Sequence, residues 1–187
     1  MVLQPFSGKR KGLHMRHIAI LEDDLDNLSA LSSVFEQRWE ATTICLSDPS
    51  EAVWTCCSEA SALDLLVCDV DLRAALTGIE AARQVVGLCP RLPILIVSGT
   101  GLGRLDDVDF EKLPQLMGER VAFIEKPFTA DRLLATADSL VESGDAPAQF
   151  IRDYYLAKMW RKTSRMTPHA NRLAALFETT ESGRGRQ

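Results

Sequence analysis

This chain of 187 residues is 46% hydrophobic and 25% charged, which is an ordinary composition for one soluble domain with a proper core. No apolar run approaches the roughly 20 residues needed to cross a bilayer, and none follows the basic N-terminus as in a secretory signal, so we expect a cytoplasmic protein with no membrane partner. The net charge is −5, but residues 16–144 hold ten bases against 22 acids, which argues against nucleic-acid binding by this part of the chain.

Short apolar runs, each bounded by polar residues, predict buried strands after an N-terminal segment without periodicity. Residues 1–15 mix Gly, Ser, Lys and Arg, and we expect them to form a disordered extension. The strands are expected at residues 17–21, 42–46, 65–69, 93–97 and 121–124.

Helical patterns separate these strands. The expected helices lie at 25–39, from Asp48-Pro49, from Thr77 to Val86, near 105–117, and from Thr129. The third begins with the capping-box pattern of Thr77 and Glu80, whereas the fourth is poorly defined. Because strands and helices alternate, the sequence predicts an α/β fold with right-handed crossovers and a parallel sheet covered on both faces, in one domain at 16–144.

Polar side chains follow the ends of four of these strands. They are Glu22 and Asp23 after the first, Asp69 at the end of the third, Ser98 after the fourth, and Lys126 after the fifth. In a parallel sheet these ends lie along one edge, where open α/β proteins bind their ligands. A cluster of carboxylates is costly unless a cation lies among them, and oxygen ligands without Cys or His favour Mg²⁺.

The strand expected at residues 65–69 ends on a carboxylate, that of Asp69, and this residue suggests the chemistry of the site. We interpret Asp69 as a nucleophile for phosphoryl groups, since a carboxylate that forms an acyl phosphate is established chemistry. Lys126 supplies a compact positive charge for a phosphoryl oxygen, and the Ser98 hydroxyl can donate to another. The acids at 22–24 also fit a plainer interpretation, the negatively charged N-terminus of a solvated helix.

Cysteine and histidine chemistry has little support. The five cysteines show no paired C-x-x-C spacing, and the three histidines are scattered. Cys45 and Cys68 fall inside strand-like runs, where we expect them to act as small hydrophobic side chains.

Five motifs, each at its expected strand end, resemble the receiver domain of two-component response regulators over about residues 16–144. They are Ile-Leu-Glu-Asp-Asp after the first strand, Val-Cys-Asp at the third, Gly78 beyond the next loop, Val-Ser-Gly at the fourth, and Phe-Ile-Glu-Lys-Pro-Phe at the fifth. The resemblance implies a flavodoxin-like (βα)5 sheet with strand order 2-1-3-4-5, the order given for a chemotaxis receiver.

The resemblance also assigns roles to single residues. It implies that Asp69 is the phosphoacceptor, that Glu22 and Asp23 hold Mg²⁺ together with Asp69 and the backbone carbonyl of Asp71, and that Lys126 contacts the phosphoryl group. Ser98 and Phe123 match the switch pair, in which the hydroxyl moves toward the phosphoryl group and the aromatic ring follows it inward. The loop after Asp69 departs from the family because it is one residue longer and has Arg73 where proline is common.

The function implied by this resemblance is that of a response regulator. The chain would take a phosphoryl group from a histidine kinase or a histidine phosphotransfer protein and would change its strand 4/5 face for partner binding or dimerisation. It would hydrolyse its own phosphoryl group slowly, without being a turnover enzyme.

Two other functions stay open at this point. Asp69-Val70-Asp71 is a D-x-D motif like that of haloacid-dehalogenase-like phosphatases, but Arg73 stands where that family usually has Thr or Val. The chain can also be read as a receiver fold used only for docking and never phosphorylated, although the full acidic set argues against this.

The C-terminal extension, residues 145–187, holds eight bases and four acids and has helical patterns at 149–160 and from Thr167-Pro168. It is too short for a winged helix or another independent DNA-binding domain. We therefore expect this extension to serve dimerisation or the docking of a partner.

Overall fold

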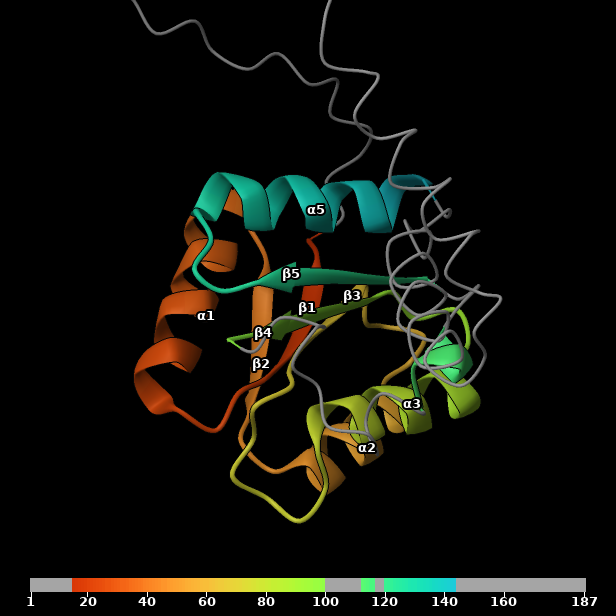
Figure 1. Ribbon diagram of the computed structural model, residues 1–187. Helices are drawn as coiled ribbons and strands as arrows, with labels where there is room; N and C mark the ends of the chain where they lie inside the picture. Colours follow the sequence, from red (N-terminus) through yellow and green to blue (C-terminus); the bar gives the residue numbers. More distant parts are fainter. Residues whose placement is uncertain (1–14, 100–111, 117–119, 144–187) are drawn as a thin grey trace, which may run out of the picture.

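A five-stranded sheet forms the centre of the molecule, with helices on both of its faces (Figure 1). The structure is a computed structural model, and it describes residues 15–99, 112–116 and 120–143. The strands are β1 (His17–Leu21), β2 (Thr42–Leu46), β3 (Leu65–Asp69), β4 (Ile94–Ser98) and β5 (Val121–Glu125). The helices are α1 (Leu25–Trp39), α2 (Pro49–Ser58), α3 (Gly78–Leu88), α5 (Ala130–Ser143) and a short 3-10 helix, η2 (Leu113–Leu116).

The sheet has the order β2-β1-β3-β4-β5, and every neighbouring pair is parallel. The fold class and strand order predicted from the sequence are therefore confirmed. β3 lies in the middle of the sheet, and its Val67 pairs with Ile20 of β1 and Leu95 of β4. All five residues of β3 are buried, as its uninterrupted apolar run predicts.

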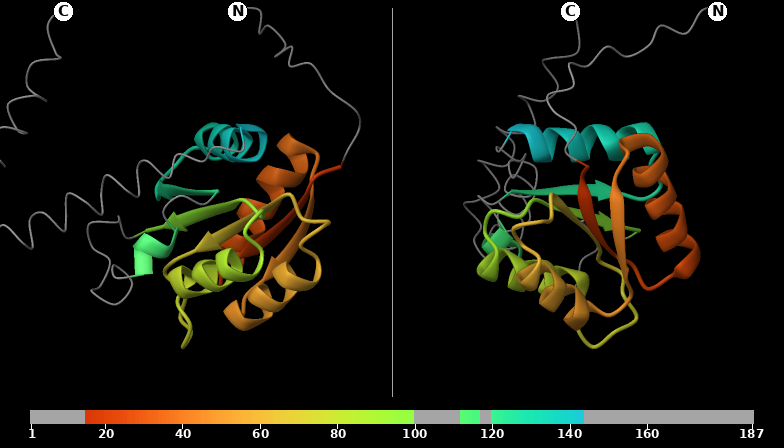
Figure 2. Two further views of the ribbon diagram at one scale, coloured as in Figure 1. Left: turned by 90° about the vertical axis from the view of Figure 1, so that its right-hand side faces the viewer. Right: turned by 180° about the vertical axis from the view of Figure 1, so that it is seen from behind.

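Two helices cover each face of the sheet, α1 and α5 on one face and α2 and α3 on the other (Figure 2). The two faces have separate cores, because successive side chains of a strand point in opposite directions. One core lies under α1 and α5 and includes Ile20, Val67 and Phe35. The other lies under α2 and α3 and includes Cys68 and Ile96. This double covering makes the sheet a rigid support for the side chains at its ends.

The edge strand β2 is less buried than the strands inside the sheet. Cys45, expected to act as a small hydrophobic side chain, is exposed there, so that prediction is wrong. Cys68 on β3 is buried, as predicted. The difference follows from strand order, which the apolar pattern of a single strand does not reveal.

Helix caps fix where several strand-to-helix connections turn. The side chain of Asp24 accepts hydrogen bonds from the first turn of α1, and Asp48 accepts one from α2. Thr77 accepts from the backbone of α3, and Thr129 accepts from the backbone of α5. The caps predicted at residues 48, 77 and 129 are confirmed.

The boundaries of the elements follow the predictions closely. α3 runs two residues beyond its predicted end at Val86, and β4 begins and ends one residue later than predicted. The helix expected near 105–117 lies mostly outside the described residues, and residues 113–116 of it form η2. The predictions for residues 1–14 and 145–187 lie outside the described residues too. Within the described part of the chain, no helix has both the length and the apolar character of a membrane span.

Candidate functional site

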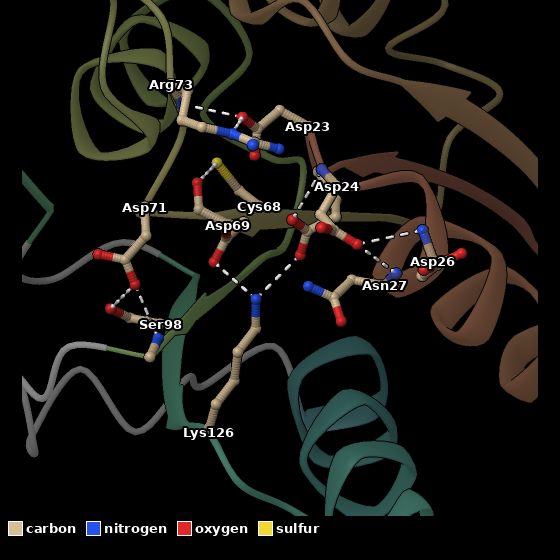
Figure 3. A network of polar contacts seen from close by, with 12 residues as sticks. Asp23, Asp24, Asp26, Asn27, Cys68, Asp69, Asp71, Arg73, Ser98 and Lys126 are labelled. Carbon is tan, nitrogen blue, oxygen red and sulfur yellow. Dashed lines mark hydrogen bonds and ion pairs between the residues drawn. The ribbon is translucent and has the colours of Figure 1, made fainter.

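The carboxyl ends of β1, β3 and β5 bring three ionisable side chains into contact (Figure 3). The Lys126 Nζ lies 3.0 Å from Asp69 Oδ1 and 2.9 Å from Glu22 Oε2. Glu22 follows β1, Asp69 ends β3, and Lys126 follows β5, so residues more than a hundred positions apart meet at one edge of the sheet. This convergence is the arrangement that the sequence predicts.

Asp69 lies almost completely out of the solvent, with 3% of its surface exposed. Burial raises the pKa of its carboxyl to about 6, because a desolvated carboxylate is costly, although the hydrogen bond and charge of Lys126 oppose this shift. The carboxylates of Glu22 and Asp71 push the pKa of Asp69 up further. A desolvated carboxylate that is paired with an ammonium is therefore available at neutral pH.

Lys126 is the counter-ion of this buried part of the cluster. Burial lowers the pKa of its ammonium, but the hydrogen bonds and charges of Glu22 and Asp69 more than offset burial, so the pKa lies above its ordinary value. Its side chain is 26% exposed, whereas that of Glu22 is 1% exposed. Lys126 thus stays charged and reaches from the solvent side into the carboxylates.

Glu22, Asp23 and Asp69 form a group that fits a divalent cation. Each offers a carboxylate oxygen, and these atoms all lie within 4.8 Å of one another. A set of oxygen donors, without nitrogen or sulfur, suits Mg²⁺ better than Zn²⁺ or Cu²⁺. The neighbouring Asp24 is the N-cap of α1. Of the three consecutive acids, Glu22 and Asp23 therefore lie in the predicted site, and Asp24 has the plainer role of an acid at a helix N-terminus.

The charge of Asp23 is balanced by a residue for which the sequence analysis gave no role. Arg73, in the loop between β3 and α3, donates from its backbone N–H at 3.0 Å and from its guanidinium Nε at 2.8 Å, both to Asp23 Oδ2. These hydrogen bonds hold the pKa of Asp23 below its ordinary value. The signal available in the sequence was a basic residue in the loop after the third strand, in a chain whose first strand is followed by consecutive acids.

Ser98 and Asp71 form a second polar contact beside Asp69. The buried Ser98 hydroxyl donates to Asp71 Oδ2 at 3.0 Å, and the backbone N–H of Gly99 donates to the same oxygen at 2.8 Å. The family resemblance implies a role only for the backbone carbonyl of Asp71, whereas the side chain of this residue connects the segment after β3 to the end of β4. Phe123 on β5 is partly buried and packs against the core under α2 and α3.

Gly78 brings the start of α3 against the backbone at the end of β3. A Cβ atom at this position would lie 1.8 Å from the Asp69 carbonyl oxygen and 2.9 Å from the Val70 Cα. These are backbone atoms, so a side chain cannot be accommodated without moving the strand or the helix. The absence of a side chain at Gly78 therefore allows α3 to begin directly against the backbone of Asp69, and this packing helps to fix the position of Asp69 at the sheet edge.

The structure thus brings together four of the predicted site residues, Glu22, Asp23, Asp69 and Lys126, and it puts Ser98 and Asp71 in a contact of their own beside them. The roles predicted for these residues remain predictions.

Comparison with known proteins gives a family for this arrangement. The family profile described as the response regulator receiver domain matches residues 18–138. No curated protein matches the chain as a relative.

Solved structures of receiver domains have the same fold. A response regulator receiver domain protein from Clostridium thermocellum is 19% identical with a TM-score of 0.58, over 69% of this chain and 96% of its own. The receiver domain of the sensor histidine kinase PA1611 from Pseudomonas aeruginosa, with a magnesium ion in its active-site cleft, is 21% identical with a TM-score of 0.55, over 68% and 98%. A CheX–CheY–BeF3–Mg complex from Borrelia burgdorferi matches at 18% identity with a TM-score of 0.56, over 67% and 88%.

Proposed function

Because this chain belongs to the family of response regulator receiver domains, we propose that Asp69 accepts a phosphoryl group from a histidine kinase or a histidine phosphotransfer protein. The observation that carries the proposal is the environment of Asp69, a buried carboxylate 3.0 Å from the Lys126 ammonium and within reach of two further carboxylates. Phosphoryl transfer requires mainly positioning and charge neutralisation, and these groups can supply both.

The proposed step is a displacement at phosphorus. A carboxylate oxygen of Asp69 forms a bond to the phosphorus of the donor, while the bond from phosphorus to the donor's nitrogen or oxygen breaks and the donor leaves with that electron pair. The product is an acyl phosphate on Asp69. Lys126, already in contact with Asp69, is well placed by its charge to stabilise the oxygens of the transferred group.

We propose Mg²⁺ as the cofactor, held by Glu22, Asp23 and Asp69, with the backbone carbonyl of Asp71 as a further ligand. When bound, the ion neutralises negative charge on the carboxylates and on the phosphoryl oxygens. The all-oxygen donor set and the short distances among its three carboxylates support this assignment.

Ser98 and Phe123 are the proposed switch pair. In this structure the Ser98 hydroxyl donates to Asp71, so its movement toward a phosphoryl group on Asp69 requires that this hydrogen bond break. Phe123 packs only partly into the core and can follow the hydroxyl inward. The change would appear on the β4/β5 face, which we propose as the surface for partner binding or for a homodimer.

Receiver domains are generally not turnover enzymes. We propose that Asp69 is regenerated by slow hydrolysis of its own acyl phosphate and that the protein acts in the cytoplasm. The C-terminal extension, residues 145–187, is proposed as a dimerisation or docking segment. Light scattering of the full chain against a chain that ends at residue 144 tests the dimer, and an unchanged mass per particle would end that part of the proposal.

The decisive experiment is intact-protein mass spectrometry after incubation with acetyl phosphate and Mg²⁺. We expect one added phosphoryl group on the wild type, lost on mild alkaline treatment, and none on Asp69→Asn. The matched control is Asp131→Asn, because the Asp131 carboxylate is 81% exposed on α5 and pairs with Arg38. Labelling that survives in Asp69→Asn would remove Asp69 from its role, and absence of labelling in the wild type would favour a receiver fold used only for docking.

A further inference from the structure

The carboxylate by which Asp23 would help to hold the cation already has a positively charged neighbour. Asp23 Oδ2 accepts two hydrogen bonds from Arg73, one from the backbone N–H and one from the guanidinium Nε at 2.8 Å. We propose that Arg73 is a tethered counter-ion that competes with the divalent cation for Asp23 and thereby sets the affinity of the site. This inference rests on the proposed function, since it assumes that the cation binds at Asp23.

The charges explain why Arg73 and a divalent cation would weaken each other's binding to Asp23. Glu22, Asp23 and Asp69 bring three carboxylates together against the single ammonium of Lys126, so the cluster attracts a further positive charge. The guanidinium supplies that charge to Asp23. A divalent cation bound to the same carboxylate would repel the guanidinium and weaken its hold on Asp23.

The exposure of the pair indicates that the guanidinium can leave. The side chain of Arg73 is 75% exposed, whereas that of Asp23 is 17% exposed. Exposed ion pairs are weak, so we expect Arg73 to reduce cation affinity by a modest factor and not to block the site. Because Arg73 lies in the loop between β3 and α3, cation binding would also release the side-chain contact that ties this loop to the end of β1.

Isothermal titration of the unphosphorylated protein with Mg²⁺, without a phosphoryl donor, tests the competition directly. For Arg73→Ala we expect the dissociation constant for Mg²⁺ to fall about two- to fivefold, the factor that corresponds to removing an exposed ion pair. Arg73→Gln, which keeps a polar side chain but removes the charge, should give the same direction. The difference from the wild type should shrink as KCl is raised, because salt screens the pair.

The matched control is Arg38→Ala, which removes a partly exposed guanidinium from an ion pair with Asp131 and should leave the Mg²⁺ dissociation constant unchanged. An unchanged or larger dissociation constant in both Arg73 variants would overturn the proposal, since it would mean that Arg73 is neutral for the cation or helps to bind it. A thermal melt of each variant, followed by circular dichroism, establishes that it is folded.

Asp23→Asn separates this proposal from the proposed function. If the wild type binds Mg²⁺ and Asp23→Asn does not, the metal site stands, and the Arg73 variants alone decide the competition. If neither the wild type nor the Arg73 variants bind Mg²⁺, the metal site is wrong and the competition falls with it. Binding that is measurable only in the Arg73 variants would support the competition in its strongest form.

Discussion

The carboxylate cluster has two halves that are neutralised in different ways. In the buried half, Glu22 and Asp69 share the ammonium of Lys126, and all three side chains come from the ends of strands. In the open half, Asp23 is paired with Arg73, an exposed residue of a loop. The two counter-ions of the cluster thus differ in exposure, 26% for Lys126 and 75% for Arg73. If the proposals hold, Lys126 serves the phosphoryl group and Arg73 exchanges with the cation.

The largest effect that we expect comes from the support beneath the buried half. Gly78→Ala would put a Cβ 1.8 Å from the Asp69 carbonyl oxygen, against backbone atoms that cannot move independently. We expect the free energy of unfolding to fall by at least about 3 kcal/mol, the upper range for forcing extra atoms into a packed site. Urea denaturation followed by circular dichroism measures this.

Gly87→Ala is the matched control for Gly78→Ala. A Cβ at Gly87 on the same helix meets no atom within 4 Å, so this change should be neutral or stabilising. Equal stability of the two variants would show that α3 does not press on the backbone of Asp69.

Removing the shared ammonium should have the next largest effect. Lys126→Met keeps most of the side-chain volume but leaves Glu22 and Asp69 without their common partner. We expect a loss of about 2–3 kcal/mol at pH 8, somewhat less than for a fully buried pair because Lys126 is partly exposed. Urea denaturation at several pH values measures it.

The pH dependence of Lys126→Met identifies the cause of the loss. Lys126 lowers the pKa of Asp69, so without it the folded state should hold the Asp69 proton to a higher pH. The loss should therefore shrink as the pH is lowered and Asp69 becomes neutral. A loss that is constant with pH would mean that the side chain matters for packing alone.

Asp69→Asn should stabilise the protein in the absence of Mg²⁺. The folded carboxyl has a pKa near 6 and the unfolded one about 3.8, so between these values the folded state binds more protons and its stability falls as the pH rises. The amide avoids this cost and can still accept from Lys126. We expect the gain at pH 8 to exceed that at pH 4 by about 2 kcal/mol, because the full shift corresponds to about 3 kcal/mol, already includes the attraction of Lys126, and is expressed mostly between these two pH values.

Urea denaturation of Asp69→Asn at pH 4, 6 and 8 tests this sign. Asp131→Asn, at an exposed carboxylate, should show no such pH-dependent gain. A loss of stability in Asp69→Asn at pH 8 would show that the attraction of Lys126 outweighs the desolvation of Asp69 in the folded state.

The two halves also differ in how well they could be predicted from the sequence. Glu22, Asp69 and Lys126 follow apolar runs, and a parallel sheet brings such positions to one edge whatever the loops do. The family resemblance, which the profile match at 18–138 confirms, supplied the strand order.

The contacts made by loop side chains could not be predicted in this way. Arg73 was visible only as a departure from the family pattern, because the path of an extended loop depends on tertiary contacts and not on periodicity. The Asp71 carboxylate was missed for a related reason. Its contact with Ser98 depends on where the chain turns after β3, which no alternation of apolar residues encodes.

The smallest effect that we expect is that of Arg73→Ala on stability. The backbone N–H of residue 73 still donates to Asp23 in this variant, and only the exposed guanidinium is lost. Exposed ion pairs contribute about 0–1 kcal/mol, so the free energy of unfolding should change by about 0.5 kcal/mol or less, against the much larger loss in Lys126→Met. A loss in Arg73→Ala as large as that in Lys126→Met would abolish the distinction between a fixed and an exchangeable counter-ion. A small change, together with tighter Mg²⁺ binding in the same variant, would mean that Arg73 serves to regulate the cation and not to hold the fold.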